Sequence, residues 1–246
     1  MVVPNFAGPS RAPVRARPGR RLNPVPQDRA AARAAWEPAL ALGLVMTMAA
    51  GFVDALGYAR LGQLYVSFMS GNSTRLGVAL AGDDFDVVRW AAAAIAVFVA
   101  GAFCGTLLVE LFARTKLPVV LGCEVAALLA ALALARAGVG RAAVLPVAFA
   151  MGLQNAIYQV AIGTDTGKSF ITGTLFGVGG SLAKFVLGKG HGVQAGIHAL
   201  SWRAFTGGVV RGACSLAWLG FDAALVLVAG VLAMVAVVVS VGVGPA

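Results

Sequence analysis

The stretch from Ala39 to Ala59 reads ALALGLVMTMAAGFVDALGYA and contains one charged side chain, Asp54, among its 21 residues. A helix needs about 20 predominantly apolar residues to cross the ~30 Å hydrocarbon core of a bilayer. Apolar core helices of soluble domains are usually much shorter than this. We therefore interpret residues 39–59 as a transmembrane helix.

The rest of the chain is also strongly apolar. Hydrophobic residues make up 59% of the sequence and charged residues 12%, with a mean hydropathy of +0.87. Soluble chains carry about 25% charged residues, so an ordinary water-soluble enzyme is excluded. We predict an all-α, polytopic membrane protein with six firm transmembrane helices. Beyond the first, these are 90–112, 117–137, 143–163, 222–244 and a more polar stretch with several glycines and Arg211, roughly 203–220.

The positive charge is concentrated at the N-terminus. Of a formal net charge of +9, residues 1–35 supply +6, from seven arginines against Asp28, and they also hold six of the ten prolines. Such a composition buries too little apolar surface to fold, and basic residues beside a first span indicate the cytoplasmic side. We predict a disordered cytoplasmic tail over 1–35. A nucleic-acid-binding arm is disfavoured because Phe6 is the only aromatic residue in 1–35. An organellar transit peptide is disfavoured because the prolines oppose the amphipathic helix that it needs.

Two weaker stretches, 64–82 and 169–187, are long enough to span but have polar centres. The first contains FMSGNSTRLGVALA at positions 68–81, and the second contains FITGTLFGVGGSLA at positions 170–183. Polar, irregular backbone at membrane depth is tolerated only where protein buries it or water lines it. We expect each stretch to be either a full helix facing the bundle interior or a re-entrant segment.

These two stretches align with each other without gaps, and so do their neighbours. Upstream, GFVDA at 51–55 matches GLQNA at 152–156. Downstream, Phe98-x-x-Gly101-x-x-x-Gly105 matches Phe205-x-x-Gly208-x-x-x-Gly212. Because three matches occur in one order, at offsets of 101, 102 and 107 residues, we predict two tandem membrane repeats.

The repeats occupy 36–140 and 141–246, and their relative orientation depends on the weak stretches. If these are re-entrant, each repeat has three spans and the halves are inverted; if they cross, each has four spans and the halves are parallel. Arg75 at the centre of a full span would cost about 2.5–3.5 kcal/mol on insertion scales. This cost favours the re-entrant, inverted arrangement.

Several of these motifs resemble the YoaK-like family of bacterial multi-pass membrane proteins of unknown function. The resemblance rests on Asp54-Ala55, on Tyr58-x-x-Leu61-Gly62, on Ser70-Gly71-Asn72 and on Thr172-Gly173-Thr174, and it covers about residues 40–190. The family typically has Thr where this chain has Ser70. The resemblance implies a multi-pass protein of the bacterial inner membrane and brings no established activity.

Asp54 is the sharpest candidate for chemistry, because an ionised carboxylate inside a span is costly unless it is paired, hydrated or protonated. It could bind a cation or proton at a pseudo-symmetric site completed by Asn155, its counterpart in the second repeat. Alternatively, Asp54 caps a broken helix or pairs with Arg60 or Arg75.

The other path candidates come from the polar motifs. Transporters built from repeats place interrupted helices at the bilayer midplane, with helix ends directed at the substrate; tight helix packing through small residues is the alternative. Glu124, inside span 117–137, could pair with Arg211 or an interior water. The substrate- or ion-path candidates are Asp54, Ser70, Gly71, Asn72, Asn155, Thr172, Gly173 and Thr174, and the glycines expected to pack helices are Gly101, Gly105, Gly208 and Gly212.

Enzyme and cofactor motifs are not supported. The segment Gly163–Ser169 is one residue short of a phosphate-binding loop and follows no strand. His191 and His198 have no Cys or paired acids nearby, so we expect no metal site, no cofactor and no catalytic set. The acids Asp83, Asp84 and Asp86 form no metal-binding motif and are expected in a solvated loop.

The sequence therefore predicts a transporter or channel-like protein for a small solute or ion in the bacterial inner membrane. Two other classes stay open: a structural or regulatory membrane subunit whose tail touches acidic lipids or a partner, and a membrane-embedded enzyme acting on lipids. The expected surroundings are the lipid bilayer, with a solute or ion as ligand, a homo-oligomer left open, and no nucleic acid.

Overall fold

The computed structural model describes residues 29–112, 115–162 and 170–242. Every regular element in these ranges is helical. In chain order the elements are α1 (Arg29–Arg60), α2 (Met69–Ala81), α3 (Phe85–Leu111), α4 (Lys116–Arg136), the 3₁₀ helix η1 (Gly140–Ala143), α5 (Val144–Ile162), α6 (Phe170–Val186), α7 (Gly192–Leu219) and α8 (Phe221–Gly242). The all-α prediction is confirmed.

Four helices are long and apolar enough to cross a membrane, as judged over the described ranges. They are Glu37–Arg60 within α1, Phe85–Leu111, Lys116–Arg136 and Phe221–Val241, and each coincides with a predicted span. The helices α5 and α7 cover most of the predicted spans 143–163 and 203–220, but neither helix is among these four. The six firm spans are thus matched in part.

The two weak stretches form α2 and α6, which are the two shortest α-helices in the described part of the chain. With 13 residues, α2 is about 20 Å long, which is too short for the hydrocarbon core, whereas the 17 residues of α6 give about 26 Å. In α2 the Ser73 and Thr74 hydroxyls donate to the Met69 and Ser70 carbonyl oxygens at 2.9 and 3.1 Å. Two of its polar side chains are thereby satisfied within their own helix.

The first helix begins earlier than expected. Residues 29–35, which the sequence placed in the disordered tail, form the first two turns of α1. Alanines fill most of this segment, and alanine has the highest helix propensity. Residues 1–28, which hold five of the seven tail arginines, lie outside the described residues.

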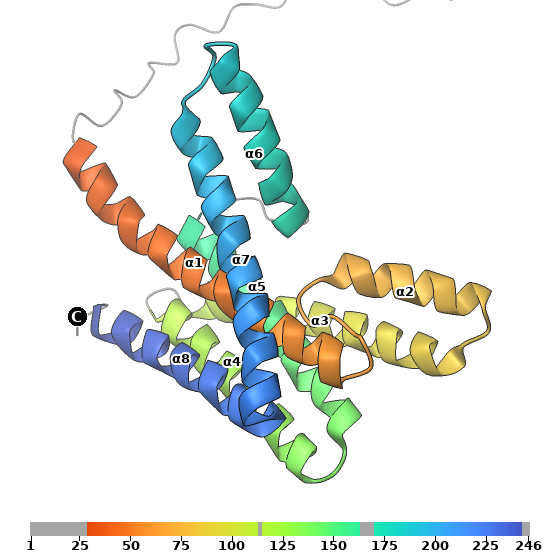
Figure 1. Cartoon of the computed structure of the whole chain (residues 1–246). Coiled ribbons are helices and arrows are strands. Elements are labelled where there is room, and N and C mark those ends of the chain that lie inside the picture. Colours follow the sequence, from red (N-terminus) through yellow and green to blue (C-terminus); the bar gives the residue numbers. More distant parts are fainter. Residues whose placement is uncertain (1–28, 113–114, 163–169, 243–246) are drawn as a thin grey trace, which may run out of the picture.

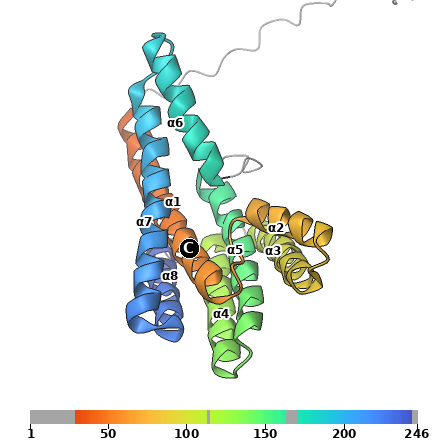
Figure 2. The same cartoon turned by 45° about the vertical axis from the view of Figure 1, so that its right-hand side comes forward.

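The helices form a central bundle from which two hairpins project. The apolar core lies among α1, α4, α5 and α8 and includes Met46, Leu128, Met151 and Leu225. In both views α2 lies along α3 on one side of the bundle, and α6 lies along α7 on a different side (Figures 1 and 2). Following the colours, α1 and α5 run in opposite directions, as do α4 and α8 (Figure 1). Large apolar side chains such as Phe103, Phe176 and Trp218 are exposed on the outer helices, which suits hydrocarbon surroundings.

The most extensive helix pairs join the two halves of the chain: α1 packs along α7, and α3 packs along α5. At the first pair, a Cβ added at Gly51 would collide with the Phe205 carbonyl oxygen, one at Gly208 with that of Met48, and one at Gly212 with that of Phe52. Only glycine allows two helix backbones to approach so closely.

The α3–α5 pair is built in the same way. A Cβ added at Gly152 would collide with the Phe98 carbonyl oxygen, and one at Gly101 with that of Phe149. One added at Gly105 would lie 3.0 Å from the Leu153 carbonyl oxygen. The four glycines expected to pack helices therefore all lie at helix–helix contacts, together with Gly51 and Gly152.

Candidate functional site

Asp54 lies near the end of α1 and organises the connection to α2. After Arg60 the chain reverses through Gly62 and Gln63, both with positive φ, and returns along α1, so that a Cβ on Gly57 would lie 2.9 Å from the Leu64 carbonyl oxygen. The returning segment lies against the Asp54 carboxylate, which is only 4% exposed.

Three groups in this segment donate hydrogen bonds to the carboxylate. The amide N–H groups of Val66 and Ser67 donate to Asp54 Oδ1 at 2.7 and 2.8 Å, and the Ser67 hydroxyl donates to Oδ2 at 2.5 Å. Hydrogen bonds to an ionised acceptor are roughly twice as strong as neutral ones. Asp54 therefore fixes the backbone just before α2 begins, and no ion pair joins it to Arg60 or Arg75 within the described ranges.

Asn72 holds the same connection from the other side. Its side chain is fully buried; Nδ2 donates to the Tyr65 carbonyl oxygen at 2.6 Å, and Oδ1 accepts from the Tyr65 amide at 3.0 Å. The neighbouring Gly71 leaves room for the aromatic rings, since a Cβ there would lie 2.7 Å from ring atoms of both Tyr65 and Phe68. The Ser-Gly-Asn motif thus positions aromatic side chains, while Ser70 itself is exposed.

These aromatic rings help to form a cavity of about 500 Å³ between the end of α1, the start of α6 and the middle of α7. Tyr58 and Tyr65 have ring centroids 5.3 Å apart, and Tyr65 and Phe68 meet edge to face at 5.4 Å. The cavity is largely apolar, and Asp54 is the one charged residue among the described residues that line it. The described lining comprises Asp54, Ala55, Tyr58, Ala59, Tyr65, Phe68, Ile171, Thr172, Phe205, Val209 and Ala213.

A second, more polar cavity of about 410 Å³ shares Tyr58, Tyr65 and Phe68 with the first. Its other lining residues include Gln63, Thr74 and Arg75. The Arg75 guanidinium donates to the Gln63 backbone carbonyl oxygen, which ties α2 to the turn after α1. The three shared aromatic side chains therefore separate a carboxylate-containing chamber from one that contains an arginine.

The predicted path residues do not all meet at one place. Of the eight, Asp54 and Thr172 line the larger cavity, and Gly71 lines the smaller one. Asn155 is half-buried and donates to the Met151 carbonyl oxygen of its own helix at 2.8 Å, and Thr174 donates to that of Ile171 at 2.7 Å. Gly173 lies between Thr172 and Thr174 in α6, and no described contact brings Asn155 to Asp54.

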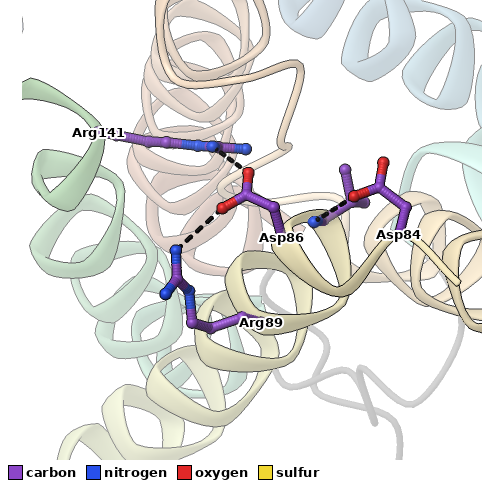
Figure 3. Close-up of polar contacts among 5 residues, drawn as sticks. Asp84, Asp86, Arg89 and Arg141 are labelled. Atoms are coloured by element: carbon purple, nitrogen blue, oxygen red, sulfur yellow. Dashed lines mark hydrogen bonds and ion pairs between the residues drawn. The ribbon is translucent and has the colours of Figure 1, made fainter.

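A separate polar cluster lies at the start of α3 (Figure 3). Asp86 bonds Arg89 at 2.9 Å and also pairs with Arg141 of the connection before α5. The Arg141 guanidinium lies over the Trp90 ring, 5.3 Å from its centroid. The Asp84 side chain accepts from the Val87 amide at 3.2 Å and caps α3. The acidic run thus serves capping and ion pairing, and no group of three metal-ligating side chains occurs in the described part of the chain.

Glu124 is buried in α4, and neither of its carboxylate oxygens has a hydrogen-bond partner in the described part of the chain. The expected partner Arg211 lies on α7, exposed, and donates to the Gly207 carbonyl oxygen of its own helix. The suggested Glu124–Arg211 pair is therefore absent from the structure. A nearby helix carries another buried polar side chain, Gln154, whose Nε2 donates to the Met46 carbonyl oxygen at 2.7 Å.

Sequence reasoning missed Ser67 and the aromatic lining of the cavity. Ser67 follows Asp54 by 13 residues, a spacing with no helical or strand periodicity, so only the folded connection reveals the pair. Phe205 was visible as the first residue of the Phe-x-x-Gly motif, yet that motif indicated packing. Cavity-lining aromatic residues carry no distinguishing pattern in a chain this apolar.

Four apolar helices of spanning length, an apolar exterior and a polar group buried between helices define an α-helical, multi-pass membrane protein. A model of the family described as "Protein of unknown function (DUF1275)" matches residues 42–238, and the chain belongs to this family. The UPF0700 transmembrane protein RA0705 of Rhizobium meliloti (strain 1021) is 32% identical over 174 residues, which cover 71% of this chain and 74% of that protein. No solved structure matches. The resemblance to a multi-pass membrane family of unknown function is confirmed.

Proposed function

We propose that this protein is a transporter or channel-like protein for a small solute or ion, and that it is not an enzyme. The observation that carries the proposal is the cavity beside Asp54. A chamber of about 500 Å³ between helices, lined by aromatic rings and one carboxylate, has the size and mixed lining of a small-molecule site. Its walls come from the end of α1, the connection that follows it, the start of α6 and the middle of α7.

The pattern of glycine contacts supports a two-repeat architecture for this pathway. Gly51 against Phe205 corresponds to Gly152 against Phe98, Gly208 against Met48 to Gly101 against Phe149, and Gly212 against Phe52 to Gly105 against Leu153. Residues of α1 and α5 differ by 101 in every case and residues of α3 and α7 by 107, the offsets at which the sequence aligns.

The opposite directions of α1 and α5 favour inverted repeats (Figure 1). Inverted repeats allow one half to rock against the other around a fixed site, which is the usual basis of alternating access in secondary transporters. The short helix α2 suits a re-entrant or broken segment, because about 20 Å of helix does not cross the hydrocarbon core.

The proposed location is the bacterial inner membrane with the N-terminus in the cytoplasm. The excess of arginine before the first span supports this orientation through the positive-inside rule. The lipid bilayer and a small solute or ion are then the main partners, and assembly of several copies stays open.

A bulky residue in the cavity tests the pathway. The purified protein is reconstituted into vesicles, and uptake of a panel of labelled ions and small solutes is measured for wild type, Thr172→Trp and Thr106→Trp. Thr172 lines the cavity, whereas Thr106 is exposed on α3 and bonds the Ala102 carbonyl oxygen of its own helix. We expect flux of at least one solute in wild type, its loss in Thr172→Trp and its retention in Thr106→Trp.

Other outcomes would redirect the proposal. Equal flux in all three proteins would mean that the cavity is not part of the transport pathway. No flux of any solute would count against transport. Deletion of residues 1–35 that abolishes the cellular phenotype while insertion stays intact would favour a regulatory subunit. Turnover of a lipid by the reconstituted protein would favour the membrane-embedded enzyme.

A further inference from the structure

Glu124 stands apart from every other acid in the described chain. Its side chain is 0% exposed, and both carboxylate oxygens lack a hydrogen-bond partner among the described residues. Glu124 is the ninth of the 21 residues of α4, about 3 Å from the midpoint of that helix along its axis. A carboxyl group is therefore buried, without a partner, close to the middle of a spanning helix.

The helices that pack against α4 offer it no counter-charge. The described side chains of α5 include no ionisable group, and the only one on α8, Asp222, bonds Arg136 at 3.0 Å at the far end of α4. On η1, Arg141 is paired with Asp86 of α3, and Arg89 of α3 is bonded to the same carboxylate. The remaining ionisable groups on α3 and α4 are Cys104, Glu110, Lys116 and Cys123, and none is bonded to Glu124.

An ionised carboxylate at such a place would lose its hydration and gain nothing in return, so the group stays neutral by holding a proton. A leucine would fill similar space without any electrostatic cost, so stability does not account for an acid here. Ionisable groups inside membrane bundles that face the interior commonly mark ion paths and proton relays.

We propose that Glu124 is a proton-binding site: the packing of α4 against α5 and α8 holds the protonated acid, and opening of that packing admits water and releases the proton. In the release step the carboxyl O–H bond breaks, the proton passes to water, and the carboxylate that remains is hydrated. The helix at the corresponding place in the second half, α8, has no acid beyond its first turn, so Glu124 is the one buried acid without a hydrogen-bond partner among the described residues. Its use as the coupling ion for transport rests on the function proposed above; proton binding itself does not.

Infrared spectroscopy of the full-length protein in lipid tests the site directly. The chain contains three glutamates, Glu37, Glu110 and Glu124, and the first and second are exposed. Carbon-13 labelling of the glutamate carboxyl groups isolates their carbonyl stretching bands from those of the aspartates. At neutral pH we expect one protonated-acid band, which Glu124→Gln removes and Glu110→Gln keeps. The absence of any such band, or its persistence in Glu124→Gln, would overturn the proposal.

A second variant covers the case in which Glu124→Gln does not fold. In the double variant Glu37→Gln, Glu110→Gln the protonated band should be unchanged, since Glu124 is then the only glutamate; its loss would overturn the assignment.

Coupling is measured separately in vesicles with a pH gradient. We expect gradient-driven solute flux to fall at least tenfold in Glu124→Gln while downhill exchange of the same solute continues. Undiminished gradient-driven flux would overturn the coupling. Absence of all flux in wild type would instead count against the proposed transport function and leave the infrared result standing.

Discussion

Replacing Asp54 by alanine should strongly destabilise the protein, because its carboxylate accepts three hydrogen bonds from the connection between α1 and α2. Its three donors are the Val66 and Ser67 amides at 2.7 and 2.8 Å and the Ser67 hydroxyl at 2.5 Å. A hydrogen bond to a charged group contributes about 1.5–3 kcal/mol, and a buried donor left without an acceptor costs about 1–3 kcal/mol. The three bonds share one acceptor group and are not additive, so we expect Asp54→Ala to lower the free energy of unfolding by about 3–6 kcal/mol.

Three comparison variants separate the contributions. Ser67→Ala removes only the hydroxyl bond and should cost about 1–2 kcal/mol. Asp54→Asn keeps an oxygen for the two amides and should fall between wild type and Asp54→Ala. In the double variant Asp54→Ala, Ser67→Ala, the cost should nearly equal that of Asp54→Ala alone, because the hydroxyl has already lost its acceptor.

The assay is reversible unfolding in mixed micelles, followed by circular dichroism as the fraction of denaturing detergent rises. A loss below about 1 kcal/mol in Asp54→Ala, less than one net hydrogen bond of this kind, would refute the role of Asp54 in holding the connection between α1 and α2. Full additivity of the Asp54→Ala and Ser67→Ala effects would refute the bond between them.

Three further predictions use the same unfolding measurement. Asn72→Ala removes both bonds to the Tyr65 backbone and should cost about 2–4 kcal/mol; a loss below about 1 kcal/mol would contradict the paired geometry. Gly208→Ala places a methyl group against the Met48 carbonyl oxygen and should cost about 1–3 kcal/mol. The control Gly230→Ala, with open space around it, should leave stability unchanged or raise it by about 0.5–1 kcal/mol. A stabilising Gly208→Ala and a destabilising Gly230→Ala would contradict the close α1–α7 contact. Glu124→Leu should leave stability unchanged or raise it by about 1–4 kcal/mol, because an apolar side chain replaces a buried acid; a large loss would reveal a partner for the carboxyl group.

The helices could be predicted from the sequence because apolar length is a local property. Spans 39–59, 90–112, 117–137 and 222–244 each coincide with an apolar helix of spanning length within a few residues. The start of the first helix could not be placed, since the alanines of residues 29–35 favour a helix while the neighbouring prolines and arginines suggested a tail.

The candidate site was only partly accessible to sequence reasoning. Asp54 was identified because charge is rare in this chain, but its partners are mostly backbone amides, which carry no residue signature. Asn155 was paired with Asp54 by position in the repeat, yet its side chain bonds its own helix. The cavity needed Phe205 and Thr172 to be brought beside Tyr58, a placement that depends on how α6 and α7 pack.

The pairing of α1 with α7 and of α3 with α5, across the two halves of the chain, has a consequence for biosynthesis. Met48 of α1 contacts Gly208 of α7, which is synthesised 160 residues later. At about 5–20 residues per second, roughly 10–30 s of translation separate the two residues. During that interval the glycine surface of α1 is open to chaperones, to membrane proteases and to wrong helices. A chain cut between α4 and η1 should therefore yield two fragments that are each short-lived when expressed alone and that protect one another when expressed together.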